Sequence, residues 1–285
     1  MHINIDSNGK ITLDWNEFAK WVIKKYAKTY SPTILCYTRK YHYLLYGNLK
    51  ELDNLTESTK ATVVKGLIIL SKFLGIHQQF KQRLLDYGIK IHRPNSFDTF
   101  IRILNTNSNG NNNILKWLSE VQPILNDSEN TFLRFCLYSG LRKSEALLSF
   151  NRIIELNNKG LLNEYYDANL NCLKHFVYPK DCIRKTKNCF ITFITEDLLK
   201  QICNSKPVSY NAIRKKLERK NIKMRINELR DYYGTYLLNH GILEAEINLC
   251  QGRIPPSIFI KHYWSPKLSE LSNRILSILK DLEKQ

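Results

Sequence analysis

Apolar residues recur every three to four positions over most of the chain, and this spacing predicts a mainly α-helical protein. One such run extends from Trp15 to Tyr26, and a second extends from Ala61 to Phe73. Glycine is common where helices end, because it adopts backbone angles that other residues avoid. We therefore expect the first helices to stop near three glycines: Gly47, Gly75 and Gly88.

Two breaks in this pattern indicate how the chain is divided. Ser31-Pro32 fits the start of a helix, with Ser31 as the cap and Pro32 at the first helical position. The charged stretch KIHRPN, residues 90–95, contains a proline that disfavours helix at the residue before it. We place an interdomain link there, which predicts a helical N-terminal domain, residues 1–92, and a second domain, residues 93–285.

The second domain begins with a polar loop and continues with helices. The asparagine-rich stretch LNTNSNGNNN, residues 104–113, is predicted to be a surface loop, because its composition cannot form a core. A helix capped by Ser128 is expected to end at Gly140, and another helix opens around Ser144. Later helices are expected over residues 209–219, 227–239 and 243–250, in a short segment opening at Pro256, and in a C-terminal helix, residues 266–285.

One segment has the composition of a β-sheet. The stretches LKHFVYP and NCFITFIT are rich in aromatic and β-branched residues, which favour strands. The polar stretch KDCIRKTK separates them. We therefore predict a β-hairpin with a basic tip as the one sheet of an otherwise helical fold.

The C-terminal helix is expected to be amphipathic, with its polar face made of Lys, Glu, Ser and Arg. Its apolar residues share one stripe: Leu268, Leu271, Ile275, Ile278, Leu279 and Leu282. This stripe is expected to pack either on the rest of the same chain or on a neighbouring protomer.

The composition is that of a globular protein without a membrane-spanning segment. Apolar residues make up 43% of the chain, and no run approaches the ~18 uninterrupted apolar residues that a span needs. The first residues, MHINIDSNGKITLDW, lack the basic start and apolar middle of a secretory signal. The seven cysteines are scattered and form no C-x-x-C pair, which is typical of reduced thiols. We expect a cytoplasmic protein.

The chain carries a large excess of positive charge. Lys and Arg total 43 against 26 acidic residues, which gives a formal net charge of +17. Nine basic residues lie between Lys206 and Arg230, and only Glu218 and Glu228 oppose them. A polyanionic partner offsets such self-repulsion, so the charge favours binding of double-stranded DNA, with a surface that resists aggregation as the alternative.

Several common enzyme signatures are missing from the sequence. It contains no G-x-x-x-x-G-K-[ST], no H-E-x-x-H and no G-x-S-x-G. The acidic residues form no evident metal-binding trio, although a two-metal nuclease built from distant carboxylates stays open. We expect neither a metal nor a cofactor.

Three arginines lie at expected helix boundaries. Arg142 follows a Gly-Leu step in YSGLRKSEALL, Arg230 lies near the start of a helix in INELRDYYGTYLL, and Arg253 lies in the glycine turn QGR. Guanidinium groups stay charged and bind phosphate oxygens two at a time, so they can stabilise a pentacoordinate phosphate without a metal. With a lysine on the hairpin tip and a tyrosine near the C-terminus, they are candidates for one phosphodiester site.

The ordered motifs SGLRKSE, NELRDYYG, QGR and KHYW resemble those of the tyrosine recombinase (phage integrase) family, most closely its archaeal, fuselloviral-type branch. The motif similarity covers residues 132–266, and the domain layout covers the whole chain. The resemblance implies a helical domain that clamps DNA and a mostly α catalytic domain with a small β-hairpin. It also implies a site-specific integrase of a mobile genetic element.

The resemblance gives the cationic motif residues their roles. Arg142 and Arg230 would clamp the non-bridging oxygens of the scissile phosphate, and Glu145 would hold Arg142 in position. Arg253 would bind the same phosphate. The family often has His at this last position, but arginine there is typical of the archaeal branch.

The resemblance also implies metal-independent covalent chemistry. Tyr263 would attack the phosphate and form a 3′-phosphotyrosyl link. The leaving 5′ oxygen would take a proton from a hairpin lysine, for which Lys187 is preferred over Lys185. Asn227 stands where many members have His or Lys, so it either hydrogen-bonds the phosphate or caps its helix.

Each of these features also has a purely structural explanation. Arg142 and Glu145 would then tie two helices together, Tyr263 would be a core or surface tyrosine, and the hairpin lysines would be solvated charges. His262 and Trp264 would contribute packing or contacts to the DNA backbone. Two other functions stay open, a type IB topoisomerase and a DNA-binding regulator without catalysis, which Asn227 favours. A recombinase of this family is expected to be a homo-tetramer on synapsed DNA and a monomer or dimer when free.

Overall fold

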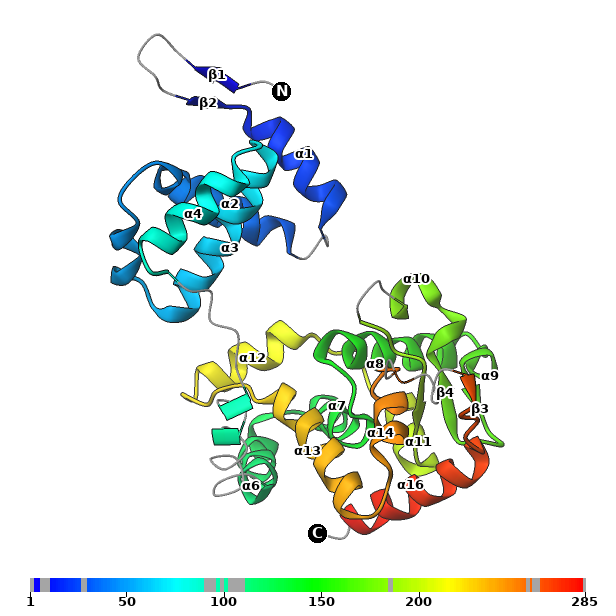
Figure 1. Ribbon diagram of the computed structural model, residues 1–285. Coiled ribbons are helices and arrows are strands. Elements are labelled where there is room, and N and C mark those ends of the chain that lie inside the picture. The colour runs from blue at the N-terminus through cyan, green and yellow to red at the C-terminus, as the bar shows by residue number, and fades with distance from the viewer. Residues whose placement is uncertain are drawn as a thin grey trace. The chain divides into compact units, whose positions relative to one another are not determined.

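The computed structural model describes residues 3–5, 11–26, 30–89, 96–97, 100–101, 111–183, 187–254, 257 and 262–283. The chain forms two compact units, Met1–Arg102 and Ile103–Gln285, hereafter unit 1 and unit 2. Both are dominated by helices, as Figure 1 shows, and unit 2 contains a small antiparallel sheet. The predicted fold class, mainly α with a small sheet, is confirmed. The predicted interdomain link, residues 90–95, lies outside the described residues.

Unit 1 is a helical bundle preceded by a short hairpin. Its strands are β1 (Ile3–Ile5) and β2 (Ile11–Leu13), an antiparallel pair that the sequence pattern did not predict. Its helices are α1 (Trp15–Lys25), α2 (Ser31–Tyr41), α3 (Glu57–Phe73) and α4 (His77–Asp86), with 3-10 turns η1 (His42–Leu45) and η2 (Leu49–Asn54). The apolar faces of α1 to α4 form one core, which includes Phe18, Val22, Leu67, Leu70 and Phe80.

The helix ends of unit 1 follow the glycine prediction more closely than the capping prediction. Gly75 and Gly88 have φ angles of 75° and 65° directly after α3 and α4, which confirms them as stops. Ser31, however, is the first residue of α2 and not its cap. The cap position belongs to Tyr30, which makes no side-chain capping bond, so the fixed φ of Pro32 in the first turn favours this helix start instead.

Unit 2 is built around α7, which packs against α8, α11 and α13. Its first helices are α6 (Asn111–Val121), α7 (Asp127–Ser139), α8 (Lys143–Asn158) and α9 (Leu162–Tyr165), with η3 (Gln122–Ile124) after α6. After the sheet follow α11 (Glu196–Cys203), α12 (Tyr210–Glu218), α13 (Ile226–Asn239), α14 (Glu244–Cys250) and α16 (Leu268–Leu282). The short helix predicted at Pro256 lies outside the described residues.

Two predictions at the start of unit 2 need correction. Residues 111–113, placed in a surface loop by their composition, are the first turn of α6. The cap of α7 is Asn126 and not Ser128: its Oδ1 accepts from the Glu129 amide at 2.9 Å, and a Glu129 carboxylate oxygen accepts from the Asn126 amide at 3.0 Å. This reciprocal pair satisfies two helix-end donors, whereas Ser128 already lies inside the helix.

The sheet of unit 2 has three antiparallel strands in the order β3 (Tyr166–Asp167), β4 (Cys172–Lys174) and β5 (Ile191–Phe193). Pairing of β4 with β5 confirms the predicted hairpin, but the strands are shorter than predicted, and β3 was not predicted. Between β4 and β5 the chain forms η4 (His175–Val177) and α10 (Pro179–Cys182). Pro179 favours this turn of helix, because its φ suits a helix start and it has no N–H to donate to a ladder.

A buried polar network fixes this hairpin to the helices. His175 Nδ1 lies 2.6 Å from the Tyr165 hydroxyl, and its Nε2 lies 2.8 Å from Thr192 Oγ1 on β5. The Tyr165 hydroxyl also contacts Ser149 Oγ of α8 at 3.0 Å. Burial lowers the pKa of His175 to about 3, so its ring stays neutral and serves as a bridge. The hairpin is therefore anchored to α8 and α9.

The C-terminal helix α16 packs on its own chain. It contributes Leu271, Ile275, Leu276, Leu279 and Leu282 to the core of unit 2. Ser272 Oγ donates to the Leu170 carbonyl at 2.6 Å, and Arg274 pairs with the buried Glu246. Of the two packing modes that the stripe left open, this chain shows the intramolecular one. None of the described helices combines the length and the apolar character that a membrane crossing requires.

Candidate functional site: an arginine ring

The turn between α7 and α8 brings Arg142 close to α13. Gly140 has a φ of 58°, and a Cβ there would lie 2.2 Å from Cδ1 of the Tyr233 ring on α13. Only glycine allows this approach and this backbone conformation together. The turn therefore lies directly against α13, the helix that carries Arg230.

Arg142 is held by contacts from two sides. Its Nη1 donates to Glu145 Oε1 at 2.9 Å and to the carbonyl of Asn188 at 3.1 Å, and its amide donates to Glu145 Oε2 at 3.1 Å. The Glu145 side chain is 4% exposed, whereas the Arg142 side chain is 23% exposed. This is the geometry expected of a carboxylate that orients a guanidinium while leaving it accessible; the catalytic role of Arg142 stays a prediction.

Arg230 is buried, at 6% exposure, and its guanidinium bonds to two backbone carbonyls. Nη1 donates to Gly140 at 2.6 Å, and Nη2 donates to Gln251 at 2.9 Å. The amide of the Gln251 side chain in turn donates to the Arg230 carbonyl at 3.2 Å. These neutral acceptors fix the direction of the guanidinium without cancelling its charge.

The glycine turn that carries Arg253 lies against the hairpin. Gly252 has a φ of 68°, and a Cβ there would lie 1.8 Å from the Asn188 carbonyl oxygen. The Arg253 amide donates to the Asn248 carbonyl at 2.7 Å, which closes the turn after α14. Arg253 itself is exposed.

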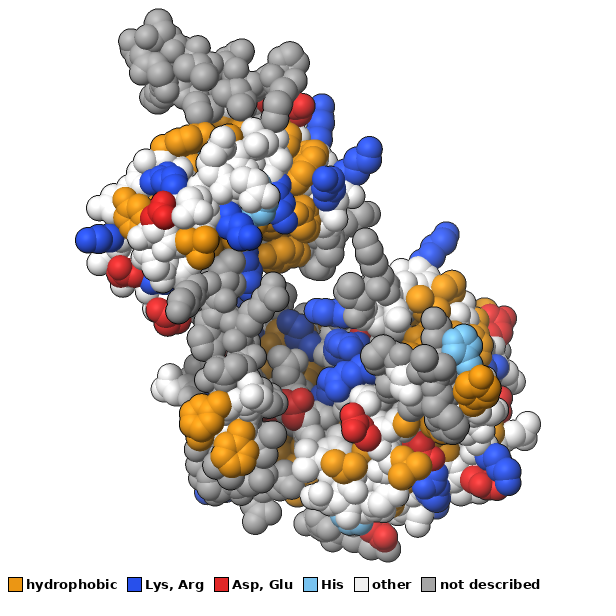
Figure 2. Space-filling model, viewed as in Figure 1, with side chains coloured by type: hydrophobic (Ala, Val, Ile, Leu, Met, Phe, Trp, Pro, Cys, Tyr) orange, Lys and Arg blue, Asp and Glu red, His pale blue; other side chains and the backbone are white. Residues whose placement is uncertain are grey.

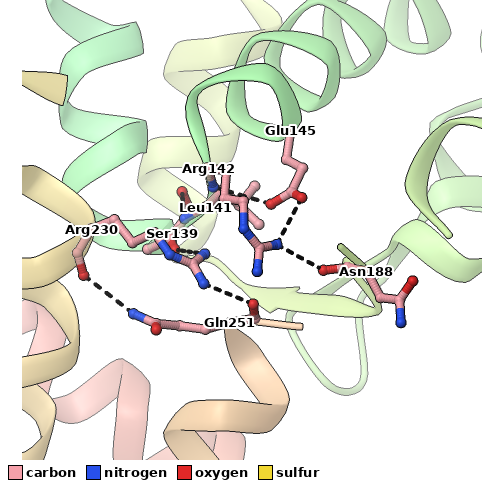
Figure 3. A network of polar contacts seen from close by, with 8 residues as sticks. Ser139, Leu141, Arg142, Glu145, Asn188, Arg230 and Gln251 are labelled. Carbon is pink, nitrogen blue, oxygen red and sulfur yellow. Dashed lines mark hydrogen bonds and ion pairs between the residues drawn. The ribbon is translucent and has the colours of Figure 1, made fainter. Parts of the chain in front are cut away.

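These contacts form a closed circuit, hereafter the arginine ring, and Figure 3 shows its hydrogen bonds. Arg142 donates to the Asn188 carbonyl, which lies against Gly252. Gly252 follows Gln251, whose carbonyl accepts from Arg230. Arg230 also donates to the Gly140 carbonyl, in the turn that carries Arg142. Four segments that are far apart in the sequence meet here. The two predicted arginines that the circuit contains are therefore positioned by the core fold of unit 2.

The arginine ring is short of negative charge. Burial, and then the positive charges of Arg142 and Arg253, lower the pKa of the Arg230 guanidinium to about 10. Glu145 and Asp231 act in the opposite direction but more weakly. Arg142 and Arg253 are thus close enough to the buried Arg230 to repel it, and a bound anion would relieve this repulsion. Arg142 and Arg230 offer donors in fixed orientations, which suits phosphate.

The hairpin places one candidate lysine beside the ring. Lys187 is exposed and directly precedes Asn188, whose carbonyl contacts Arg142 and whose backbone pairs with Ile183. Lys185 lies outside the described residues. The choice between these two lysines as the proton donor stays a prediction.

Tyr263 lies outside the arginine ring, on the stretch between α14 and α16. Its side chain is 73% exposed, more than that of any other large hydrophobic residue in the described part of the chain. The ring of His262 lies edge-on to it, with centroids 6.4 Å apart. Tyr263 is therefore no core tyrosine, and its hydroxyl group belongs to a side chain that solvent can reach.

Asn227 is not a helix cap. Helix α13 begins at Ile226, and Arg225 occupies the cap position and pairs with Glu228. Asn227 is the second residue of the helix, and its side chain is exposed. Of the two roles that the sequence left open, only the contact with phosphate stays as a prediction.

The basic segment from Lys206 to Arg230 contains both paired and unpaired cations. Ion pairs join Lys216 to Glu129, Arg214 to Glu218 and Arg225 to Glu228. Among described residues, no carboxylate lies within ion-pair distance of five other exposed members: Lys206, Lys215, Arg219, Lys220 and Lys223. Figure 2 shows Lys and Arg side chains gathered on the face of unit 2 near α12 and α8.

Sequence reasoning did not find three residues of the ring: Gly140, Asn188 and Gln251. Each accepts from an arginine through its backbone carbonyl, which leaves no mark on residue type. Gln251 does lie in the QGR motif, so its position beside the turn glycine was a usable signal.

In the ranges that the structure describes, no three His, Cys, Asp or Glu side chains form a metal-binding group.

The comparison with known protein families supports an assignment for unit 2. A family model described as archaeal phage integrase matches residues 111–270, which is more than half of the chain. The match extends from α6 to the start of α16 and contains every residue of the arginine ring. No individual curated protein matches the chain significantly. The chain therefore belongs to the archaeal phage integrase family, a family of DNA-recombining proteins.

Proposed function

We propose that the protein is a tyrosine site-specific recombinase that cleaves and rejoins duplex DNA through Tyr263. The observation that carries this proposal is the arginine ring, in which burial and the positive charges of Arg142 and the nearby Arg253 lower the pKa of the Arg230 guanidinium. A DNA phosphodiester supplies the missing negative charge. Family membership, which makes DNA the substrate, supports the same choice.

The ring is suited to the transition state of phosphoryl transfer. Attack on the phosphate builds charge on its non-bridging oxygens, and Arg142 and Arg230 offer guanidinium donors that the fold has already oriented. Donors fixed in a water-poor site need not reorganise during the reaction, and one such donor contributes about 10²–10³ in rate. In other nucleases, metal ions stabilise this negative charge. Here we assign the same role to the guanidinium groups, so we propose a metal-independent reaction.

The covalent step conserves atoms and charge without any redox partner. The Tyr263 oxygen forms a bond to phosphorus, the bond from phosphorus to the 5′ oxygen breaks, and the phenolic proton leaves to solvent. The 5′ oxygen takes a proton from Lys187, or from Lys185 as the alternative. Rejoining is the reverse, with a 5′ hydroxyl of a partner duplex attacking the 3′-phosphotyrosyl link. Arg253 and Asn227 are assigned to the same phosphate.

The test is formation of a covalent 3′ adduct on nicked suicide duplexes tiled across the DNA that flanks the gene. We expect the wild type to form the adduct in the presence of EDTA, and Tyr263→Phe to form none while binding DNA equally well. Tyr46→Phe is the matched control, because Tyr46 is another exposed tyrosine, at 55%, in unit 1.

Other outcomes separate the alternatives. Binding by the wild type without any adduct would contradict the proposal and favour a regulator without catalysis. Relaxation by a monomer of a plasmid that lacks a special site would favour a type IB topoisomerase. A recombinase is expected to assemble as a tetramer on two synapsed duplexes, which particle mass on DNA measures.

A further inference from the structure

Gln251 contacts Arg230 at two points and in opposite directions. Its backbone carbonyl accepts from Arg230 Nη2 at 2.9 Å, and its side-chain amide donates to the Arg230 carbonyl at 3.2 Å. The residue is 5% exposed and directly follows α14. One residue therefore fixes both the main chain and the guanidinium of Arg230 relative to the end of α14.

The sequence of α13 leaves room for this side chain. Gly234 faces it, and a Cβ there would lie 3.1 Å from Gln251 Nε2 and 3.8 Å from Ile247 Cγ2. A contact of 3.1 Å is tighter than carbon and nitrogen normally tolerate, so any larger residue at position 234 would displace the amide by a few tenths of an ångström. The amide and the glycine form a matched pair across two helices.

Gln251 is also the point at which two parts of the arginine ring join. The next residue, Gly252, lies against the Asn188 carbonyl, which accepts from Arg142. The residue after that is Arg253. A shift of Gln251 would therefore move the acceptor of Arg230 and the turn of Arg253 together.

We propose that Gln251 is a positioning residue, whose side-chain amide holds Arg230 and sets its spacing from Arg253 for phosphate. This proposal rests on the proposed function. Arg230 is repelled by both neighbouring arginines, so its orientation depends on its acceptors. Every residue at position 251 has a carbonyl, and its own N–H bonds to the Ile247 carbonyl of α14 at 2.9 Å. The side-chain amide of Gln251 adds a hydrogen bond to α13, so it fixes that carbonyl relative to the helix that carries Arg230. Gln251 itself contacts no reacting atom in this assignment.

The first variant is Gln251→Leu, which keeps a similar volume and removes the amide. We expect its DNA dissociation constant to stay within about twofold of wild type, because the exposed cations still neutralise phosphates. Single-turnover cleavage of the suicide duplex should slow by about 10–100-fold, since an ångström-scale misplacement of a catalytic group costs about that much. Wild-type cleavage by this variant would overturn the proposal.

A double-mutant cycle tests whether Gln251 acts through Arg230. In an Arg230→Ala background, Gln251→Leu should slow cleavage little further, because the group that it positions is gone. A second, independent loss of the same size would overturn the proposal in favour of a general effect on the fold.

Gly234→Ala and a control separate positioning from stability. Alanine is a better helix former than glycine, so Gly234→Ala should keep or raise the unfolding temperature while slowing cleavage several-fold. Asn151→Leu is the matched control: Asn151 also bridges segments by an amide, with contacts to Val208 of 3.1 and 2.9 Å, but away from the ring. It should lower the unfolding temperature without a specific loss of cleavage.

Inorganic phosphate gives a readout that does not need the reaction. Phosphate should raise the unfolding temperature of the wild type and of Asn151→Leu, and raise that of Gln251→Leu less. If the wild type forms no covalent adduct, the proposed function fails, but the phosphate shift still tests Gln251. An equal phosphate shift in wild type and Gln251→Leu would overturn the positioning role even where cleavage is observed.

Discussion

The arginine ring and the Tyr263 stretch are the two halves of the proposed site, and the protein builds them in opposite ways. Arg230 is 6% exposed and bonds to carbonyls from two other segments, whereas Tyr263 is 73% exposed. The half that we propose to bind the phosphate is centred on Arg230 in the core of unit 2, and its hydrogen bonds are formed without DNA. The proposed nucleophile, in contrast, is exposed to solvent. Changes in the ring should therefore affect both folding and chemistry, and changes at Tyr263 should affect chemistry alone.

The largest effect that separates the two halves is expected from Arg230→Ala. Loss of one preorganised donor should slow single-turnover cleavage by about 10²–10³. Two buried carbonyls, of Gly140 and Gln251, also lose their partner, at a cost of about 1–3 kcal/mol each. Relief of the repulsion from Arg142 and Arg253 offsets part of this cost, so the free energy of unfolding should fall by less than the sum.

Tyr263→Phe is the counterpart, because it should abolish the adduct and leave the free energy of unfolding within about 0.5 kcal/mol of wild type, as exposed substitutions usually do.

Arg230→Lys serves as the control for the charge of Arg230. It keeps the positive charge but cannot bridge two carbonyls, so we expect little recovery of cleavage. Cleavage by Arg230→Ala within tenfold of wild type would contradict the role of the ring.

A smaller effect is expected from Gly252→Ala, which tests the contact between the Arg253 turn and the hairpin. An added Cβ would meet the Asn188 carbonyl at 1.8 Å, so the turn or the hairpin must move. Because that carbonyl also accepts from Arg142, cleavage should slow by about tenfold or more. Single-turnover cleavage and chemical denaturation measure the two consequences separately.

Gly160→Ala isolates the backbone part of this effect. Gly160 has a φ of 70°, close to the 68° of Gly252, but nothing lies within 4 Å of a Cβ added there. Both variants should therefore carry the left-handed backbone cost of about 1–2 kcal/mol. Only Gly252→Ala should also slow single-turnover cleavage, because only its Cβ would meet the hairpin. Equal cleavage by the two variants would show that the contact with the hairpin does not matter.

Local patterns in the sequence were enough to predict part of the fold. Helices with regular apolar spacing, such as α1 and α3, and the glycine stops after α3 and α4 follow from local pattern. The strands β1, β2 and β3 have only two or three residues, too few for alternation to be detected. At α7, two capping residues lie two positions apart, and only the reciprocal bonds of Glu129 decide for Asn126.

For the proposed site, the sequence indicated the arginines and the contact of Glu145 with Arg142, but not the backbone groups that also hold Arg142 and Arg230. Arg142, Arg230 and Arg253 stand in motifs whose order along the chain is visible. The backbone acceptors of Arg142 and Arg230 are the carbonyls of Asn188, Gly140 and Gln251, and any residue type supplies a carbonyl. Close approaches such as Gly252 against Asn188 depend on the tertiary fold, which a pattern of residue types does not contain.

The smallest effect that we predict concerns cations outside the arginine ring. They should contribute to DNA binding and not to cleavage, whereas Arg230 should contribute mainly to cleavage. Lys215 is exposed on α12 without an acidic partner in the described parts of the chain, whereas its neighbour Lys216 contacts the buried Glu129 at 2.7 Å. A lysine that neutralises one phosphate contributes about 0.9 to the slope of log affinity against log salt. Lys215→Gln should lower this slope by about that amount in a binding titration, and leave cleavage at saturating protein unchanged.

Lys216→Gln, the adjacent control, should instead leave the salt slope nearly unchanged and destabilise unit 2, because it removes the partner of a buried carboxylate. Arg230→Ala should likewise change the slope little, because a cation already confined to the core releases few counterions when DNA binds. If Lys215→Gln slowed cleavage at saturation, or if Arg230→Ala lost binding in proportion to cleavage, the division between a binding surface and a chemical core would not hold. The opposite result, with slope and rate responding to different residues, would show that this integrase holds its DNA with exposed charge and reacts with it through buried charge.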